Sequence, residues 1–159
     1  MSRTIAVTGG TGFIGGMLIH HLVNAGYQVR ALTRDRSAHK LPQLAGLEAV
    51  SGSLQDSNSL QRLLQGASAV VHCAGAVRGV TAADFNAVNV DGVIQLVRAA
   101  LSLSPRPRFL SLSSLAARAP QLSHYASSKH QGEQALASMA ADMEWVALRP
   151  PAVYGPGDK

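Results

Sequence analysis

Short apolar runs alternate along the chain with longer segments whose apolar residues recur at helical spacing. The short runs predict strands, which lie at Thr4–Thr8, Gln28–Thr33, Leu47–Val50, Ala69–Cys73, Arg108–Ser113 and Trp145–Leu148. The longer segments predict helices, which lie at Phe13–Asn24, Ser57–Gln65, Ala82–Leu101 and Ser123–Ala140. The polar segment 35–46 contains Pro42, so any helix in it should be short.

This alternation predicts βαβ units, and hence an α/β fold with a parallel sheet and helices on both faces. The run SAVVHCAG is continuously apolar, as expected of a strand that is buried on both sides. A chain of 159 residues is long enough for one domain with a core, and we expect one domain over residues 1–159.

Glycines gather where the first strand meets the first helix. The stretch VTGGTGFIGG, residues 7–16, contains five of the 15 glycines, although a glycine inside a helix costs roughly 1 kcal/mol relative to alanine. The spacing fits both G-x-G-x-x-G and G-x-x-G-x-x-G, where a Cβ would collide with a dinucleotide pyrophosphate. The helix start offers that anion unpaired N–H groups and the positive end of the helix dipole.

The glycine pattern therefore predicts a Rossmann-type, doubly wound fold, and a plain glycine-rich turn is the alternative. The predicted cofactor-binding residues of this turn are Gly9, Gly10, Thr11, Gly12, Phe13, Ile14 and Gly15.

The end of the second strand favours NADP over NAD. Thr33 stands at its tip, followed by Arg34 and then Asp35. An acidic residue at the tip would bind the ribose 2′-hydroxyl of NAD, whereas an arginine forms bidentate contacts with the 2′-phosphate of NADP. We therefore predict NADP, with NAD as the alternative, and Thr33 and Arg34 as binding residues. Both charges could instead be ordinary loop residues.

The amino-acid composition limits the kinds of partner that this protein can bind. Charged residues make up only 14% of the chain, against roughly a quarter in average proteins. The net charge is +5, but the basic residues do not cluster and aromatic residues, at 4%, leave little to stack on bases. No apolar run approaches the ~20 residues that span a bilayer. We expect no nucleic acid and no membrane as partner.

The single cysteine, Cys73, cannot form an internal disulfide, and the start MSRTIAV lacks the apolar core of a secretory signal. Both observations favour a cytoplasmic location. The six histidines show no spacing with carboxylates that argues for a metal, so no metal site is predicted.

Six segments follow one another in the order that a known enzyme family shows: TGGTGFIG, VVHCAGAV, NVDGV, FLSLSSLAA, YASSK and LRPPAVYGPGD. With them, nearly the whole chain resembles the extended short-chain dehydrogenase/reductases, a branch that includes NAD(P)-dependent epimerases, dehydratases and reductases. The resemblance implies that Cys73, Ala74 and Gly75 lie beside the adenosine ribose. Where family members commonly carry an acid near the adenine, this chain has Ser53 followed by Leu54, which weakens that contact.

Tyr125 and Lys129 form a Y-x-x-x-K pair, so on a helix they share one face. An ammonium near a phenol stabilises the phenolate, which aids proton exchange at neutral pH. By the resemblance, Lys129 also reaches the nicotinamide ribose, and Tyr125 exchanges a proton with the substrate while hydride moves to or from the nicotinamide. The alternative is that Tyr125 and Lys129 are ordinary surface residues of a helix without a catalytic role.

Ser114 is our choice for the hydroxyl that binds the reacting oxygen, with the adjacent Ser113 as its rival; both could instead be turn or capping residues. Asn89 lies inside the predicted helix Ala82–Leu101, where an asparagine usually points to solvent. The resemblance implies instead that Asn89 bends the helix and holds a water near Lys129, in a supporting catalytic role.

The predicted function is an NAD(P)-dependent oxidoreductase, epimerase or dehydratase that acts on a small-molecule substrate of unknown class. The alternative is a non-catalytic NADP-binding module that senses redox state or supports a complex. The extended branch continues into a C-terminal substrate lobe, so we expect residues 1–159 to be a fragment truncated before it, with a natural short form as the alternative. The resemblance also suggests a homodimer through helices 82–101 and 123–140, and exposed apolar surface should favour self-association.

Overall fold

A computed structural model describes residues 3–158, which contain a six-stranded parallel sheet in the order β3-β2-β1-β4-β5-β6. The strands are β1 (Thr4–Thr8), β2 (Gln28–Thr33), β3 (Leu47–Ser51), β4 (Ala69–His72), β5 (Arg108–Leu112) and β6 (Trp145–Leu148). The α-helices are α1 (Phe13–Asn24), α2 (Ser57–Leu64), α3 (Ala82–Asn89), α4 (Asp91–Leu101) and α5 (His124–Met139). Short 3₁₀ helices are η1 (Asp35–Lys40), η2 (Leu115–Arg118) and η3 (Pro120–Leu122). This strand order is that of the Rossmann fold, so the predicted fold class is confirmed.

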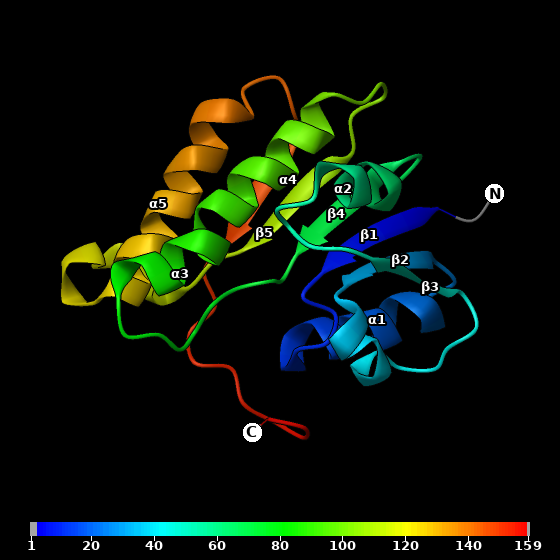
Figure 1. Ribbon diagram of the computed structural model, residues 1–159, viewed down its shortest axis with the longest axis horizontal. Coiled ribbons are helices and arrows are strands. Elements are labelled where there is room, and N and C mark those ends of the chain that lie inside the picture. The colour runs from blue at the N-terminus through cyan, green and yellow to red at the C-terminus, as the bar shows by residue number, and fades with distance from the viewer. Residues whose placement is uncertain (1–2, 159) are drawn as a thin grey trace.

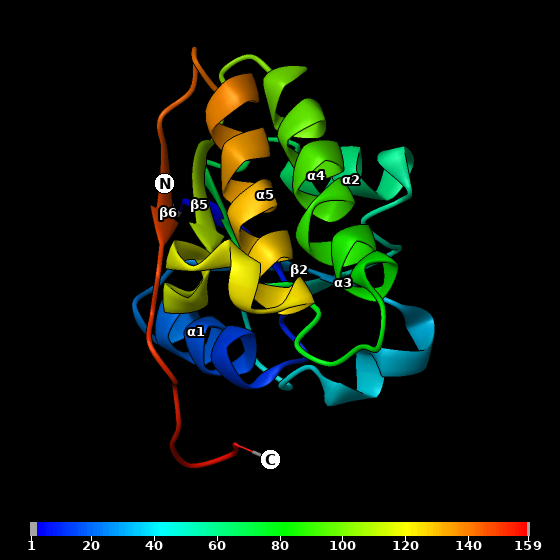
Figure 2. The same cartoon turned by 90° about the vertical axis from the view of Figure 1, so that its left-hand side faces the viewer.

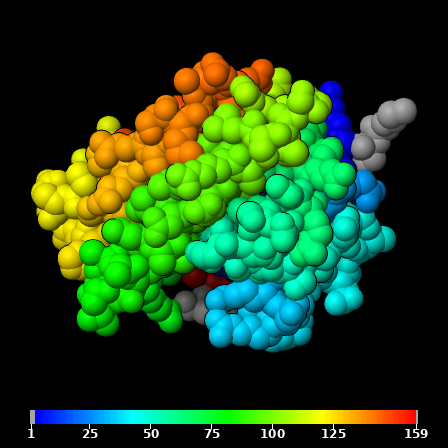
Figure 3. All heavy atoms as spheres, turned by 45° about the horizontal axis from the view of Figure 1, so that its top comes forward, coloured from blue at the N-terminus to red at the C-terminus, as the bar shows by residue number. Residues whose placement is uncertain are grey.

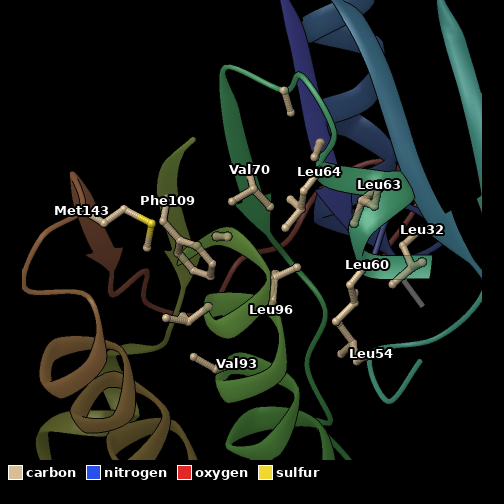
Figure 4. Close-up of a cluster of buried hydrophobic side chains, with 14 of the residues drawn as sticks. Leu32, Leu54, Leu60, Leu63, Leu64, Val70, Val93, Leu96, Phe109 and Met143 are labelled. Carbon is tan, nitrogen blue, oxygen red and sulfur yellow. The ribbon is translucent and has the colours of Figure 1, made fainter. Parts of the chain in front are cut away.

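Helices cover both faces of the sheet, with α2, α4 and α5 on one side and α1 on the other (Figure 1). On the first side, leucines of α2 and α4 pack with Phe109 of β5 and Val70 of β4 in the larger core (Figure 4). On the second side, Ile19 of α1 packs on Val7 and Val29. These layers leave the carboxyl ends of the strands facing the loops that carry the predicted site.

The predicted strand and helix bounds hold to within one residue, except that the helix predicted over Ala82–Leu101 is two helices. The joint is Val90, whose φ of −114° is far from the −63° of a regular helix. At the joint the Asn89 carbonyl lies against α5, where a Cβ on Gly132 would come within 2.2 Å of it. Close packing between α3 and α5 therefore accounts for the break.

Strand β6 and the segment after it run along one edge of the molecule (Figure 2), and several of their large apolar side chains are exposed. They are Trp145, Val146, Leu148, Val153 and Tyr154. The predicted self-association and the homodimer through helices 82–101 and 123–140 stay predictions. Within residues 3–158, no helix combines the length and apolarity that a membrane span requires.

Candidate active site

The glycine turn between β1 and α1 is packed too closely for side chains. A Cβ on Gly9, whose φ is +74°, would lie 2.5 Å from the Ala74 nitrogen, and one on Gly15 would lie 2.2 Å from the Gly9 carbonyl oxygen. At Gly12, the N-cap of α1, the nearest described atom to a Cβ would be the Gly9 oxygen at 3.4 Å, so space remains outside the turn. The first N–H groups of α1, which no side chain caps within the described residues, are therefore available to an anion.

The remaining residues of the turn point in different directions. Thr11 lines the first pocket described below, and Ile14 lines the second. Gly10 is buried, and a Cβ there would lie 2.6 Å from Ile19 Cδ1, so this glycine lets α1 pack on the sheet. Phe13 lines a separate hollow on the outer side of the turn. The linings of the two pockets include none of Gly10, Gly12, Phe13 and Gly15.

A first pocket of about 240 Å³ lies at the carboxyl ends of β1 to β4. Figure 3 shows a hollow in the surface between α3 and η1. Val88 of α3 and Ser37 of η1 are among the residues that line this pocket. Predicted residues in its lining are Gly9, Thr11, Thr33, Arg34, Ser53, Leu54, Ala74 and Gly75. Residues that the sequence did not single out are Thr8, Leu32, Ser37, Gly52, Gln55 and Val88.

The tip of β2 presents Arg34, not Asp35, to this pocket. Arg34 is the only charged residue among the described residues of the lining, and the Ser37 backbone N–H donates to its carbonyl oxygen at 2.8 Å. The Asp35 carboxylate accepts a hydrogen bond from the Ser51 hydroxyl at the end of β3. This bond turns the acidic side chain toward the sheet edge and leaves the pocket cationic.

A second pocket, of about 690 Å³, lies at the carboxyl end of β5 and brings the predicted catalytic residues together. Its lining includes Tyr125, Lys129, Ser113, Ser114 and Cys73. The two pockets share Gly75, with the glycine turn between them. The shared wall and the open turn fit a dinucleotide that lies across the crossover between β1 and β4.

Lys129 reaches from α5 to the end of β5. Its Nζ donates to the Leu112 carbonyl oxygen at 3.0 Å, and a Cβ on Gly75 would lie 3.0 Å from the same Nζ. Burial lowers the pKa of Lys129, while Cys73 and Glu133 act in the opposite direction. The ammonium is thus held by a carbonyl in a partly desolvated site, where its charge has a strong effect on neighbours.

Tyr125 lies in the first turn of the same helix, and its ring packs edge-on against Phe85 of α3, with ring centroids 6.2 Å apart. Cys73 also lines this pocket; burial raises the pKa of its thiol to about 11, against the opposing effect of Lys129. Cys73 is therefore a neutral thiol at neutral pH and not an activated nucleophile.

The two candidate serines differ in exposure. Ser114 is half-buried, and its Oγ accepts from the Ala116 backbone N–H, which caps η2 and leaves its own hydrogen free to donate. Ser113 is buried, with 7% of its surface exposed, and lines both the second pocket and a smaller cavity behind it. The geometry favours Ser114 as the hydroxyl that a substrate can reach.

Asn89 is buried and does not point to solvent. Its Oδ1 accepts from the Ala76 backbone N–H at 2.9 Å, and its Nδ2 donates to the Ala76 carbonyl oxygen and the Ser128 hydroxyl. Ser128 in turn donates to the Tyr125 carbonyl oxygen. Asn89 therefore joins the loop after β4 to the first turns of α5, which fixes the backbone that carries Tyr125 and Lys129.

Glu133 anchors α5 to the end of β6. Arg149 Nε donates to both of its carboxylate oxygens, at 2.9 and 3.1 Å, and Arg149 Nη2 adds a third contact. Burial raises the pKa of Glu133, but hydrogen bonds from Arg149 and Ser113 and the positive charge of Arg149 outweigh it, so the net pKa is below the ordinary 4.5.

We expect Glu133→Gln to lower the free energy of unfolding at pH 7 by less than about 1 kcal/mol, because the pair is partly exposed. Since folding depresses this pKa, the ionised carboxylate adds stability above the unfolded-state value of 4.5 and loses it as the pH falls through the folded-state value. Thermal denaturation of the two proteins should therefore converge at acid pH. Glu144→Gln is the control, because Glu144 and Arg108 are both more than 70% exposed and should matter less. A Glu133→Gln deficit that does not change with pH would contradict this explanation.

Comparison with known proteins places the site in context. A family model described as the NAD dependent epimerase/dehydratase family matches residues 5–159. The chain is 42% identical over 154 residues to ceramide reductase of Caulobacter vibrioides, across 97% of this chain and 47% of that protein. It is 29% identical over 184 residues to UDP-glucose 4-epimerase of Vibrio cholerae, across 100% of this chain and 54% of that protein. The chain spans about half the length of these curated relatives.

Among solved structures, the enzyme WbmG of Bordetella bronchiseptica, crystallised with NAD, superposes with a TM-score of 0.79 and 28% identity. The match covers 94% of this chain and 53% of that one. A likeness of this extent agrees with the fold described above.

Proposed function

Because this chain belongs to the NAD dependent epimerase/dehydratase family, we propose that it binds NADP across the carboxyl edge of its sheet and takes part in the reduction of a carbonyl group. The observation that carries this proposal is the common cavity of Tyr125, Lys129 and Ser114, which shares Gly75 with the pocket that contains Arg34. Positioned acid, ammonium and hydroxyl groups beside a dinucleotide pocket suit hydride-transfer chemistry.

The proposed cofactor contacts follow from the two pockets. The open turn at Gly12 and the first N–H groups of α1 receive the pyrophosphate, and Arg34 with the Ser37 hydroxyl receives the 2′-phosphate. Residues 53 and 54 flank the adenine, and Lys129 lies where it can reach the nicotinamide ribose.

In the proposed reaction, bound NADPH supplies the hydride that reduces the carbonyl carbon. Tyr125 gives its phenolic proton to the carbonyl oxygen, so the product is an alcohol. Ser114 donates a hydrogen bond to the same oxygen, and the Lys129 ammonium stabilises the phenolate that Tyr125 becomes. Asn89 supports this step by fixing the loop after β4 against α5.

The lining of the second pocket favours an apolar substrate. Lys129 is the only charged residue among its described lining residues, and much of the remainder is apolar, including Val77, Leu115, Leu122 and Val153. The diphosphate of a sugar nucleotide calls for cations that this lining does not offer. We therefore propose an uncharged ketone on an apolar chain, a preference that the 42% identity to a ceramide reductase also supports.

An assay of the complete protein tests this function. We expect NADPH consumption with long-chain alkyl ketones and none with UDP-sugars. Interconversion of UDP-glucose and UDP-galactose without net NADPH consumption would assign the protein to the epimerases instead.

Arg34→Gln should weaken NADPH binding roughly 10- to 100-fold, because hydrogen bonds to a charged group contribute about 1.5–3 kcal/mol. NADH, which lacks the 2′-phosphate, should bind with little change. Calorimetric titration with both nucleotides measures the effect. Arg36→Gln is the matched control, because Arg36 is exposed on η1 and does not line the pocket. Equal losses in the two variants would mean a general charge effect.

A further inference from the structure

The two charged residues that follow β2 project in different directions. Arg34 lines the first pocket, whereas Asp35 begins η1 and is absent from that lining. A 3₁₀ helix has three residues per turn, so side chains three positions apart lie on one face. Arg34 and Ser37 have this spacing, and both line the pocket. Asp35 therefore projects from another side of η1, although its backbone lies between two residues that line the pocket.

Ser51, the last residue of β3, holds the Asp35 carboxylate on that other side. The Ser51 hydroxyl donates a hydrogen bond to Asp35 Oδ1. Ser51 stands opposite Thr33 in the parallel register of β2 and β3, and its carbonyl oxygen accepts from Arg62 Nη2 of α2 at 2.8 Å. The next N–H, that of Gly52, donates to the Thr33 carbonyl oxygen at 3.0 Å. The hydroxyl that holds Asp35 is therefore carried by a backbone that is anchored on both sides.

The guanidinium of Arg34 has no such partner. It makes no hydrogen bond or ion pair with any residue in the range 3–158. Its backbone is fixed, because the Arg34 carbonyl oxygen accepts from the Ser37 N–H at 2.8 Å and from the Thr33 hydroxyl at 3.2 Å. The carboxylate nearest to Arg34 along the chain is that of Asp35, and opposite charges at short range attract. The bond to Ser51 therefore keeps Asp35 from pairing with its neighbour in the chain.

Release of the Asp35 carboxylate would favour NADH over NADPH in either direction that it moves. A carboxylate paired with Arg34 occupies the N–H donors that the 2′-phosphate of NADPH requires. A carboxylate that turns toward the ribose repels this phosphate and accepts a hydrogen bond from the 2′-hydroxyl of NADH. Arg34 is the only charged residue among the described residues of the pocket lining, so no second cation there compensates.

We propose that Ser51 determines nucleotide specificity: by binding the Asp35 carboxylate it keeps Arg34 unpaired, and so it sets the preference for NADPH. Ser51 does not line the pocket, so it is a positioning residue that acts through Asp35. This inference rests on the proposed function, because it requires both nucleotides to bind beside Arg34. One hydroxyl outside the pocket thus controls which nucleotide the site selects.

Calorimetric titration of the parent and four variants with NADPH and with NADH tests this proposal. The variants are Ser51→Ala, Ser51→Thr, Asp35→Asn and the double variant that combines Ser51→Ala with Asp35→Asn. Ser51 is exposed at the end of an edge strand, so alanine leaves no cavity in the core, and threonine keeps the hydroxyl and suits a strand. Asparagine keeps the shape of the Asp35 side chain and removes its charge. Together the variants form a double-mutant cycle that isolates the coupling between the two residues.

We expect Ser51→Ala to lower the ratio of NADPH affinity to NADH affinity by about three- to ten-fold, the effect of losing one hydrogen bond of ordinary strength. Ser51→Thr should keep the parent ratio. In the Asp35→Asn background, Ser51→Ala should have no further effect, because a neutral amide forms no ion pair with Arg34 and carries no charge to repel the phosphate. An unchanged ratio in Ser51→Ala, or an equal fall in both backgrounds, would overturn the proposal while the proposed function stands. Binding of neither nucleotide by the parent would overturn both.

Discussion

Tyr125→Phe should lower kcat of the complete protein by about 10²- to 10⁴-fold, the usual contribution of a positioned general acid. The phenyl ring keeps the edge-on contact with Phe85, so the helix that carries Lys129 should stay in place. Nucleotide affinity should change by less than about two-fold, because the acid acts on the substrate and the main proposed cofactor contacts lie elsewhere. Steady-state kinetics and calorimetry on the same preparation measure the two effects.

Tyr27→Phe is the matched control. Tyr27 lies just before β2, at the amino ends of the strands and so away from the site, and it packs against the core that contains α1. It should leave kcat unchanged. Turnover that persists in Tyr125→Phe would remove the proposed acid. A protein that binds NADPH tightly but turns over no substrate in either form would match the alternative, a non-catalytic module that senses redox state or supports a complex.

Gly15→Ala should both destabilise the chain and abolish dinucleotide binding. Its Cβ would lie 2.2 Å from the Gly9 carbonyl oxygen, a backbone atom that moves only if the whole turn moves. Overpacking of this kind costs about 1–3 kcal/mol and occasionally more. A displaced Gly9 also closes the approach to the first turn of α1. Thermal denaturation and calorimetric titration with NADPH measure the two losses.

Gly16→Ala is a close control, since it lies one residue further along the same helix. Its Cβ would meet the Gly10 carbonyl oxygen at 3.5 Å, an ordinary contact, and alanine favours the helix by up to about 1 kcal/mol. This variant should therefore be as stable as the parent or more stable, with nucleotide binding retained. Similar losses of stability and nucleotide binding in both variants would show that the start of α1 tolerates no alanine at either position. The close approach of Gly15 to Gly9 would then not explain the effect of Gly15→Ala.

The features that the sequence predicted well are those that local pattern determines. The doubly buried run before Cys73 identified β4, and the glycine spacing identified the turn that α1 needs. The family model over residues 5–159 confirms the resemblance to epimerases and reductases of the short-chain class. The individual roles of Tyr125, Lys129 and the serines stay predictions, although the fold brings these side chains into one cavity.

The features that the sequence missed depend on contacts between distant segments. The break at Val90 arises where Asn89 meets Ser128, which is 39 residues away in the chain. The hydrogen bond between His72 and Thr8 likewise joins residues that are 64 positions apart in the chain. Arg34 rather than Asp35 faces the pocket because Asp35 bonds to a serine on the neighbouring strand. Local patterns carry no information on such pairs.

Calorimetric titration of this chain with NADPH and, separately, with NADH tests the central claim most directly. We expect both nucleotides to bind, with NADPH at least about ten-fold tighter because Arg34 meets the 2′-phosphate. Equal or tighter binding of NADH would contradict the assignment of NADP and make Arg34 an ordinary loop charge. Binding of neither nucleotide by the folded chain would contradict the dinucleotide site itself.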